Sequence, residues 1–304
     1  MRGFLAITGG TGFVGQTLIK LAAESGWQIR ALARRPQAAQ AKVTWVAGAL
    51  DQPDTLASLV TGTDAVIHVA GVTNSPTRQG FVDGNVKGTR EVVNALAAHG
   101  PRRLIQVSSL SAREPSLSTY GWSKAEAEKI VGNSGLDWTM IRPPAIYGPG
   151  DHDHLDLFKA ARWGVIPLPP PGRMSEIHVS DLARLLLAVV GDEGSTGKTY
   201  EVDDGREGGW THAEFARAIG RAVGRPGVLA LSLPASLVRL GAKLDRWLRG
   251  DKAKLTPDRA AYFCHPDWVI DPTQRPPAAL WVPEVETDAG LKATAQAYRD
   301  ADWI

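Results

Sequence analysis

Short apolar runs alternate with amphipathic stretches along the first half of the chain. Runs of about five to seven residues rich in Val, Ile, Leu and Ala predict strands that are covered on both faces of a sheet. Turn residues follow several of these runs. We expect the strands at 3–8, 28–33, 43–47, 65–70, 102–108 and 138–142.

The stretches between these runs have apolar residues at helical spacing. After the first strand, Val14, Leu18 and Leu21 share one face of a helix that Gly26 ends. Longer helices are expected at 81–99 and 120–131. Strands that alternate with helices predict an α/β fold, in which a parallel sheet has helices on both faces. Right-handed crossovers then give the doubly wound topology of a Rossmann fold.

The rhythm changes after about residue 150. Pro167–Gly172 predicts an extended, polyproline-like loop. Helical patterns and one short strand follow, at 180–190, 211–223, 234–248 and 199–202. We therefore expect a first domain over 1–150, which segments at about 175–205 rejoin. The remainder, 151–304, is expected to be a smaller, mostly helical C-terminal lobe that binds substrate.

Composition and charge narrow the possible partners. The 304 residues fit two domains of roughly 150 residues each. With 34 basic and 32 acidic residues, the net charge of +2 gives no general attraction to nucleic acid or to an anionic membrane, and we expect neither as a partner. Cys264 is the only cysteine, so no disulfide can form within the chain. We expect a cytoplasmic protein that acts on a small molecule.

A glycine-rich turn joins the first predicted strand to the first helix. Thr8–Gly15 reads TGGTGFVG and contains both G-x-G-x-x-G and G-x-x-G-x-x-G. Glycines allow the tight turn and let backbone N–H groups approach a pyrophosphate, while the helix N-terminus adds partial positive charge. In this strand–turn–helix context, the motif predicts that the first domain binds a dinucleotide.

Two arginines follow the second predicted strand. Arg34 lies 19 residues after Gly15, where a dinucleotide-binding fold places the residue that contacts the adenosine ribose. A carboxylate there would accept a hydrogen bond from a 2′-hydroxyl, whereas the guanidinium groups of Arg34 and Arg35 can bind a 2′-phosphate. This favours NADP as the cofactor, with NAD as the alternative if both arginines are only solvated surface residues.

A tyrosine and a lysine stand four residues apart at the start of the predicted helix 120–131. Tyr120 and Lys124 therefore share one helix face, and an ammonium beside a phenol favours the phenolate. Such a pair can donate or accept a proton at a usable pH, although Tyr-x-x-x-Lys alone is a common pattern. A serine cluster after the fifth strand is either an ordinary turn or a hydroxyl site for a substrate oxygen; its members are Ser108, Ser109 and Ser111.

The segment His152–Asp156 reads HDHLD and contains residue types that bind metals. It lacks two histidines four residues apart on a helix, and it directly follows a Gly-Pro-Gly-Asp turn. We expect a polar loop that caps a helix at about Asp153. No metal site is expected.

Together these residues resemble the short-chain dehydrogenase/reductase superfamily. The motifs RPPAIYGPGD at 142–151 and IHVSDLA at 177–183 are similar to its extended branch, the NAD-dependent epimerase/dehydratase family. The resemblance covers most of residues 1–205. The other positions that support it are Thr8–Gly15, Ala70, Gly71, Asn85, Ser109, Tyr120 and Lys124.

The resemblance implies a cofactor-binding role for several of these residues. The pyrophosphate would be lined by Gly9, Gly12 and Gly15, with backbone groups from Thr11, Phe13 and Val14. Ala70 and Gly71 would lie along the cofactor. Asn85 would support the site, and Pro143 would begin the loop under the nicotinamide.

It also implies the catalytic set. Tyr120 would be the acid/base, and Lys124 would lower its pKa and hold the nicotinamide ribose. Ser109 would be the catalytic serine, with Ser108 or Ser111 in its place if the alignment shifts. A homodimer through the helices 81–99 and 120–131 is a further expectation from the family.

Two departures from the family's pattern bear on function. Ser109 and Tyr120 are only 11 residues apart, closer than in sugar-nucleotide epimerases, a trimming that resembles the atypical members near the accessory subunit of respiratory complex I. The epimerases' diphosphate-binding arginine would fall at Met174, with Arg173 one position away.

We therefore expect an NADP-preferring oxidoreductase that passes a hydride between the nicotinamide and a carbonyl or hydroxyl carbon, similar to the dihydroflavonol reductases. A nucleotide-sugar epimerase or dehydratase is the enzymatic alternative. A non-catalytic dinucleotide sensor or scaffold is the alternative from another class.

Overall fold

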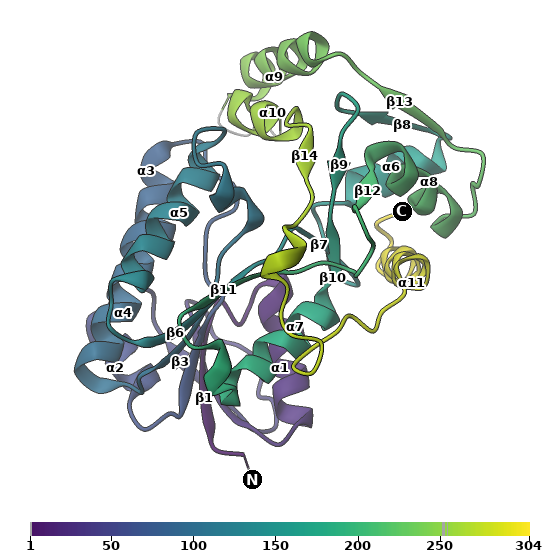
Figure 1. Ribbon diagram of the computed structural model, residues 1–304. Coiled ribbons are helices and arrows are strands. Elements are labelled where there is room, and N and C mark those ends of the chain that lie inside the picture. Colours follow the sequence, from purple (N-terminus) through teal and green to yellow (C-terminus); the bar gives the residue numbers. More distant parts are fainter. Residues whose placement is uncertain (1, 251–252, 254) are drawn as a thin grey trace. The chain divides into compact units, whose positions relative to one another are not determined.

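The computed structural model describes residues 2–250, 253 and 255–304 (Figure 1). The chain divides into two compact units. Unit 1 comprises Met1–Arg142, Leu182–Glu201 and Gln274–Trp281. Unit 2 comprises Pro143–Asp181, Val202–Thr273 and Val282–Ile304.

Unit 1 is built on a seven-stranded sheet in the order β11-β6-β5-β4-β1-β2-β3. Every neighbouring pair is parallel, which confirms the predicted doubly wound parallel sheet. The strands are β1 Phe4–Thr8, β2 Gln28–Ala33, β3 Val43–Ala47, β4 Ala65–His68, β5 Arg103–Val107, β6 Asp137–Arg142 and β11 Lys198–Glu201.

Helices cover both faces of this sheet (Figure 1). On one face lie α2 Pro53–Val60, α4 Gly88–His99 and α5 Thr119–Gly132, and on the other α1 Phe13–Glu24 and α7 Val179–Ala188. The first group packs its apolar stripes against the buried side chains of the strands. Leu59, Val92 and Val131, for example, join Ala6, Val66 and Leu104 in one fully buried cluster.

The structure corrects the single helix expected over 81–99. That segment contains the end of a short helix α3 Arg78–Phe81, then a π-helical turn Val82–Lys87, and then α4. A π-helical turn accommodates an extra residue in a helix and often occurs at a functional site. Here it presents the side chain of Asn85 to the backbone of Val72.

The order of the strands reverses beside β1. The chain leaves β1 toward β2 and β3, and then returns to β4 on the other side of β1. In open α/β sheets, ligands bind at the carboxyl ends of the strands where the order reverses. The glycine turn follows β1 and Ala70-Gly71 follows β4, so both predicted cofactor segments are at this point.

Unit 2 combines helices with short two- and three-stranded sheets. Its strands are β7 Ala145–Tyr147, β8 Val165–Leu168, β9 Arg173–Met174, β10 Glu176–His178, β12 Trp210–Thr211, β13 Leu229–Ser232 and β14 Asp267–Trp268. Its helices are α6 Leu155–Arg162, α8 His212–Ala222, α9 Ala235–Arg249, α10 Pro257–Phe263 and α11 Thr287–Asp300. The core of this unit includes Tyr147, Phe158, Phe215 and Tyr298, all fully or almost fully buried.

The predicted polyproline loop at 167–172 is partly wrong. Its first two residues belong to β8, which pairs in parallel with β13. Pro167 is tolerated in a strand that has a neighbour on one side only, because no ladder hydrogen bond is needed from its nitrogen on the open side. Among the described helices of the whole chain, none is both long and apolar enough to cross a membrane.

Candidate active site

The glycine turn brings the ends of β1 and β4 very close together. Gly9 adopts a positive φ of +73°, and a Cβ atom there would lie 2.6 Å from the backbone nitrogen of Ala70. A Cβ atom on Gly15 would lie 2.1 Å from the carbonyl oxygen of Gly9. Any other residue at either position would therefore push helix α1 or the β4 segment away from the turn.

The N-terminus of α1 is open to an anion. Gly12 is the N-cap residue, and in the described structure no side chain caps this helix and no acidic residue lies in its first turn. A Cβ atom on Gly12 would meet only the Gly9 carbonyl oxygen, at 3.4 Å. The backbone N–H groups that begin at Phe13 and Val14 therefore fit the pyrophosphate of a dinucleotide.

Arg34 and Arg35 directly follow β2, at the carboxyl end of the strand beside β1. Both side chains are exposed, and neither forms an ion pair with any residue that the structure describes. The two guanidinium groups are therefore free to meet a phosphate at this end of the sheet.

A buried network joins the ends of β1, β4 and α4. His68 Nδ1 lies 2.6 Å from Thr8 Oγ1, and His68 Nε2 lies 3.1 Å from Thr89 Oγ1. Burial, together with the smaller effect of the Lys124 ammonium, lowers the pKa of His68 to about 3. The imidazole is therefore neutral, and it holds together the strand ends that frame the glycine turn.

Asn85 links three segments around the same edge of the sheet. Its Oδ1 accepts from the Val72 N–H at 2.6 Å, and its Nδ2 donates to the Val72 carbonyl at 2.9 Å and to Ser123 Oγ at 2.8 Å. Ser123 in turn donates to the Tyr120 carbonyl. Asn85 thus joins the segment at Val72 to helix α5.

Lys124 is a buried cation with one hydrogen-bond partner among the residues that the structure describes. Its side chain reaches the carboxyl end of β5, where Nζ donates to the Val107 carbonyl at 2.7 Å. A Cβ atom on Gly71 would lie 3.1 Å from Asn85 Oδ1 and 3.8 Å from Nζ, so a larger residue there would crowd Asn85 and would only touch the ammonium. Burial lowers the pKa of Lys124 to about 8, while the negative charge of Glu128 opposes this shift.

Tyr120 lies one helical turn before Lys124. Helix α5 begins at Thr119, and the Ser118 hydroxyl caps it by accepting from the Gly121 N–H at 2.9 Å. The Tyr120 side chain is half-buried, and its ring centroid lies 6.2 Å from that of Phe81. The cap and the ring contact fix where the phenol leaves the helix.

The structure separates the roles of the three candidate serines. Ser108 donates its hydroxyl to Glu128 Oε1 at 2.5 Å, so its proton is already used. Ser109 accepts from the Ser111 N–H at 3.2 Å and from the Ser111 hydroxyl at 2.9 Å. A hydroxyl that accepts in this way keeps its own proton for another acceptor.

A cluster of buried and half-buried charges lies beside helix α5. Arg142 forms two hydrogen bonds with Glu128, at 2.8 and 2.7 Å, and a third with Glu201 at 3.4 Å. Arg113 approaches the other oxygen of Glu201 at 3.5 Å. This cluster was not predicted from the sequence. The one local indication of it is that Glu128 follows Lys124 by four residues, which places the two charges on the same helix face.

Two other candidates, Pro143 and the segment His152–Asp156, lie in unit 2. Pro143 is the first residue of this unit and directly follows β6. In the segment His152–Asp156, the predicted cap at Asp153 is wrong, because the Asp151 carboxylate accepts from the N–H groups of residues 153 and 154. His154 itself lies between two carboxylates, 2.6 Å from Asp151 and 3.4 Å from Glu176. No group of side chains that could hold a metal ion occurs among the described residues.

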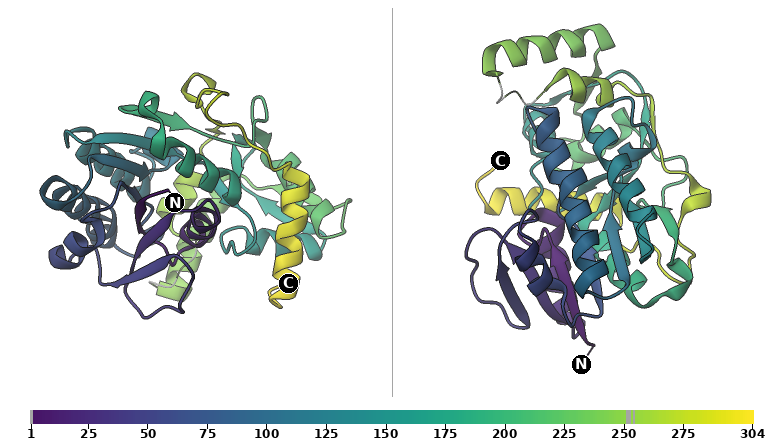
Figure 2. Two further views of the ribbon diagram at one scale, coloured as in Figure 1. Left: turned by 90° about the horizontal axis from the view of Figure 1, so that it is seen from below. Right: turned by 90° about the vertical axis from the view of Figure 1, so that its left-hand side faces the viewer.

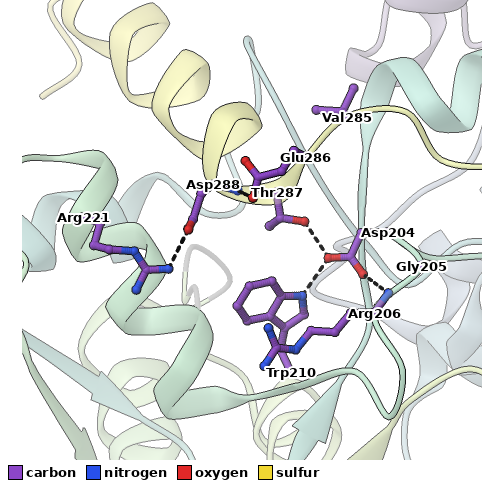
Figure 3. A pocket seen from close by; sticks show the side chains of 9 residues that line it. All are labelled: Asp204, Gly205, Arg206, Trp210, Arg221, Val285, Glu286, Thr287 and Asp288. Atoms are coloured by element: carbon purple, nitrogen blue, oxygen red, sulfur yellow. Dashed lines mark hydrogen bonds and ion pairs between the residues drawn. The ribbon is translucent and has the colours of Figure 1, made fainter.

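A cavity of about 400 Å³ also lies in unit 2 (Figure 3). Asp204 Oδ2 accepts from the Trp210 indole and from Thr287, and Arg206 stacks on the Trp210 ring. Figure 3 shows Arg221 paired with Asp288 across the cavity. The polar groups of its wall bind one another, so the cavity gives no reason to assign a ligand.

Comparisons with known proteins agree with this arrangement. A family model described as NAD(P)H-binding matches residues 9–193. The chain is 37% identical to the ceramide reductase of Caulobacter vibrioides, over 100% of this chain and 96% of that protein. It is 29% identical to the 2-alkyl-3-oxoalkanoate reductase of Stenotrophomonas maltophilia, with 95% and 97% covered.

The fold is also that of solved structures. A human epimerase family protein, solved with NADPH, matches with a TM-score of 0.74 and 19% identity, over 96% of this chain and 99% of that one. The chain therefore belongs to the extended short-chain dehydrogenase/reductase superfamily, in its NAD-dependent epimerase/dehydratase family, and is an NAD(P)-dependent oxidoreductase.

Proposed function

We propose that the chain is an NADP-preferring reductase that acts on the ketone of a long-chain, hydrophobic substrate. The observation that supports this best is the buried Lys124 ammonium, one helical turn after Tyr120 at the carboxyl end of β5. Burying a cation against one neutral carbonyl costs stability, and such a cost is typical of functional sites.

The residues of unit 1 divide the work of the proposed reduction. NADPH, when bound, supplies the hydride. The Tyr120 hydroxyl gives its proton to the oxygen on which negative charge develops, and the Lys124 ammonium stabilises the phenolate that remains. The Ser109 proton, which no described residue accepts, donates a hydrogen bond to the same oxygen.

The cofactor would be held by the segments that meet beside β1. The N–H groups of the glycine turn and of the start of α1 would bind the pyrophosphate. Arg34 and Arg35 would bind the 2′-phosphate of the adenosine ribose, and Lys124 the nicotinamide ribose. Ala70, Gly71 and Pro143 would line the cofactor with backbone atoms.

The relatives suggest the class of substrate. A ceramide and a 2-alkyl-3-oxoalkanoate both carry alkyl chains, and the two reductases named for them match nearly the whole of this chain. A sugar nucleotide is disfavoured by the chain's own residues. Met174 stands where epimerases have their diphosphate-binding arginine, and the neighbouring Arg173 donates to the carbonyls of Gly208 and Gly209.

The test measures NADPH oxidation by the purified protein with 3-oxoacyl compounds of increasing chain length and with UDP-glucose. We expect stoichiometric oxidation that improves with chain length, from protein that purifies without cofactor. Protein that purifies with tightly bound NAD⁺ and interconverts sugar nucleotides would instead be an epimerase. No turnover with any carbonyl compound would leave the dinucleotide sensor.

The same assay tests the proton donor. Tyr120→Phe should lower turnover about 10²- to 10⁴-fold, because only the acidic hydroxyl is lost, and it should leave NADPH affinity unchanged. Tyr200→Phe, at a buried tyrosine in β11, is the matched control and should keep wild-type turnover. Near-normal turnover of the Tyr120 variant would remove the assigned role.

A further inference from the structure

Helix α9 has an apolar face that the fold does not use. Five large side chains along it are between 50% and 80% exposed: Leu237, Leu240, Leu244, Trp247 and Leu248. At 3.6 residues per turn, their spacing places all five within one arc of about 100°. Single exposed leucines are common on proteins, but a continuous stripe along a helix indicates an interaction surface.

The opposite side of α9 is the side that holds it in unit 2. Val238 and Ala242 are buried there, and they pack with Ala260 of α10 and with Leu255. Figures 1 and 2 show α9 lying over α10. The exposed stripe therefore contributes little to folding.

A basic stripe runs beside the apolar one. The helical spacing places Arg239, Lys243 and Arg246 next to each other, along one edge of the exposed leucines. All three are exposed, and none has an ion pair with a residue in the described part of the chain. The only acidic residue of the helix, Asp245, is already used, because it pairs with Arg249 and accepts from the Leu255 N–H.

We propose that α9 docks this chain on an anionic membrane surface. Leucines and a tryptophan on one stripe, with arginine and lysine on the next, are the pattern of a helix that lies in the plane of a membrane interface. The apolar stripe would enter the boundary between headgroups and acyl chains, where a tryptophan ring is favoured. The basic stripe would contact lipid phosphates.

A second copy of the chain fits this surface less well. A stable protein interface takes roughly 20 to 30 residues from each side, and α9 offers one stripe of five. Two copies that met through this face would also bring their basic stripes together. A membrane surface supplies negative charge instead and needs no matching shape.

The docking goes beyond the proposed reduction and holds whichever carbonyl compound is the substrate. Net charge alone would not reveal such a surface. The charge of +2 is an average over the chain, whereas α9 has four basic residues and one acidic residue within 15 positions.

The test is co-sedimentation of the full chain with vesicles of phosphatidylcholine, with and without about a quarter phosphatidylglycerol. We expect binding to the anionic vesicles that falls as salt rises from 0.05 to 0.5 M. Leu244→Glu with Trp247→Glu should lower binding more than tenfold. Arg239→Glu, Lys243→Glu and Arg246→Glu together should lower it about a hundredfold, since each cation near such a surface contributes roughly fivefold.

Matched controls keep the test specific. Trp163→Glu alters a tryptophan that is 89% exposed but lies just after α6. Lys20, Arg217 and Lys292, changed together to Glu, alter the charge by the same amount elsewhere. Both controls should bind like the wild type, and circular dichroism should show every variant folded.

Three outcomes would overturn the docking. The first is a wild type that does not bind the vesicles. The second is a loss of binding in the controls that equals the loss in the α9 variants. The third is a dimer that light scattering detects and that Trp247→Glu separates, with no binding to vesicles. Turnover of a soluble carbonyl compound is measured in parallel. If the α9 variants keep that turnover, a failure of docking stays distinct from a failure of the proposed reduction.

Discussion

A half-buried and a buried cation lie at the carboxyl ends of neighbouring strands, and their surroundings differ. Arg142, at the end of β6, has two hydrogen bonds to Glu128 and one to Glu201. These carboxylates raise its pKa. Lys124 is directed to the end of β5, where the Val107 carbonyl is its one hydrogen-bond partner in the described part of the chain, and burial lowers its pKa to about 8.

The difference separates a structural cation from one available for chemistry. Glu128 follows Lys124 by one turn of α5, yet its oxygens are occupied by Arg142 and by Ser108. Glu128 therefore acts on Lys124 through space, and among the described residues no hydrogen bond joins the Lys124 ammonium to the Glu128 carboxylate. An ion pair whose hydrogen bonds are satisfied can be part of a stable fold. A buried charge without an ion-pair partner lowers the stability of the fold, and such charges are typical of functional sites.

The largest effect is expected where the pairing is removed. Arg142→Met would remove the cation that pairs with Glu128 and one of the two cations beside the buried Glu201, and we expect the free energy of unfolding to fall by about 3 kcal/mol. Urea unfolding measures this. Arg102→Met is the control, because the exposed pair of Arg102 with Asp137 should contribute less than about 1 kcal/mol. Equal losses in the two variants would end the distinction drawn above.

The opposite sign is expected at the unpaired cation. Lys124→Met removes a buried ammonium whose pKa is lowered from 10.5 to about 8, a shift equivalent to about 3 kcal/mol. Loss of the hydrogen bond to Val107 offsets about 1 kcal/mol of this. We expect the variant to be more stable than the wild type by about 2 kcal/mol at pH 7, and to lose turnover and cofactor affinity.

The pH dependence of that gain gives its cause. Below pH 8, Lys124 is charged in both the folded and the unfolded chain, so the full cost of burial is present. Between pH 8 and 10.5 the unfolded chain binds the extra proton, so the stability of the wild type rises with pH and the advantage of the methionine shrinks. Urea unfolding of both proteins at pH 7 and pH 10, without cofactor, tests this; a constant difference would refute the assigned cause.

Features of the structure that depend on local patterns could be predicted from the sequence. Most of the sheet of unit 1 was predictable, because its strands other than β11, which reads KTYE, are rich in apolar residues and several are followed by turn residues. Tyr120, Lys124 and the glycine turn depend on local spacing, which is also legible in the sequence. The π-helical turn at Val82–Lys87 was missed because it depends on the contact of Asn85 with a segment 13 residues away.

Contacts between distant segments were the least predictable. Arg142 and Glu201 are brought together by β6 and β11, which are far apart in the chain. The strands of unit 2 that the sequence analysis missed have only two to four residues, too few for a period to show. The exposed stripe of α9 was visible as a helical pattern, but only the structure shows which of its apolar faces is buried.

A pair of exposed cations extends the comparison, and its expected effect is on cofactor binding and not on the stability of the fold. Arg34 and Arg35 directly follow β2, are exposed to water and form no ion pair within the described chain. They would act only when a 2′-phosphate arrives, and a charge-assisted contact contributes about 1.5–3 kcal/mol. Replacing both by alanine should therefore weaken NADPH about ten- to a hundredfold and leave NADH almost unchanged. Fluorescence titration of both cofactors against wild type and variant measures this, with Arg217→Ala as the exposed control. If the wild type binds NADH as tightly as NADPH, the two arginines are surface residues only, and the proposed preference for NADP fails while the chemistry of Tyr120 and Lys124 stands.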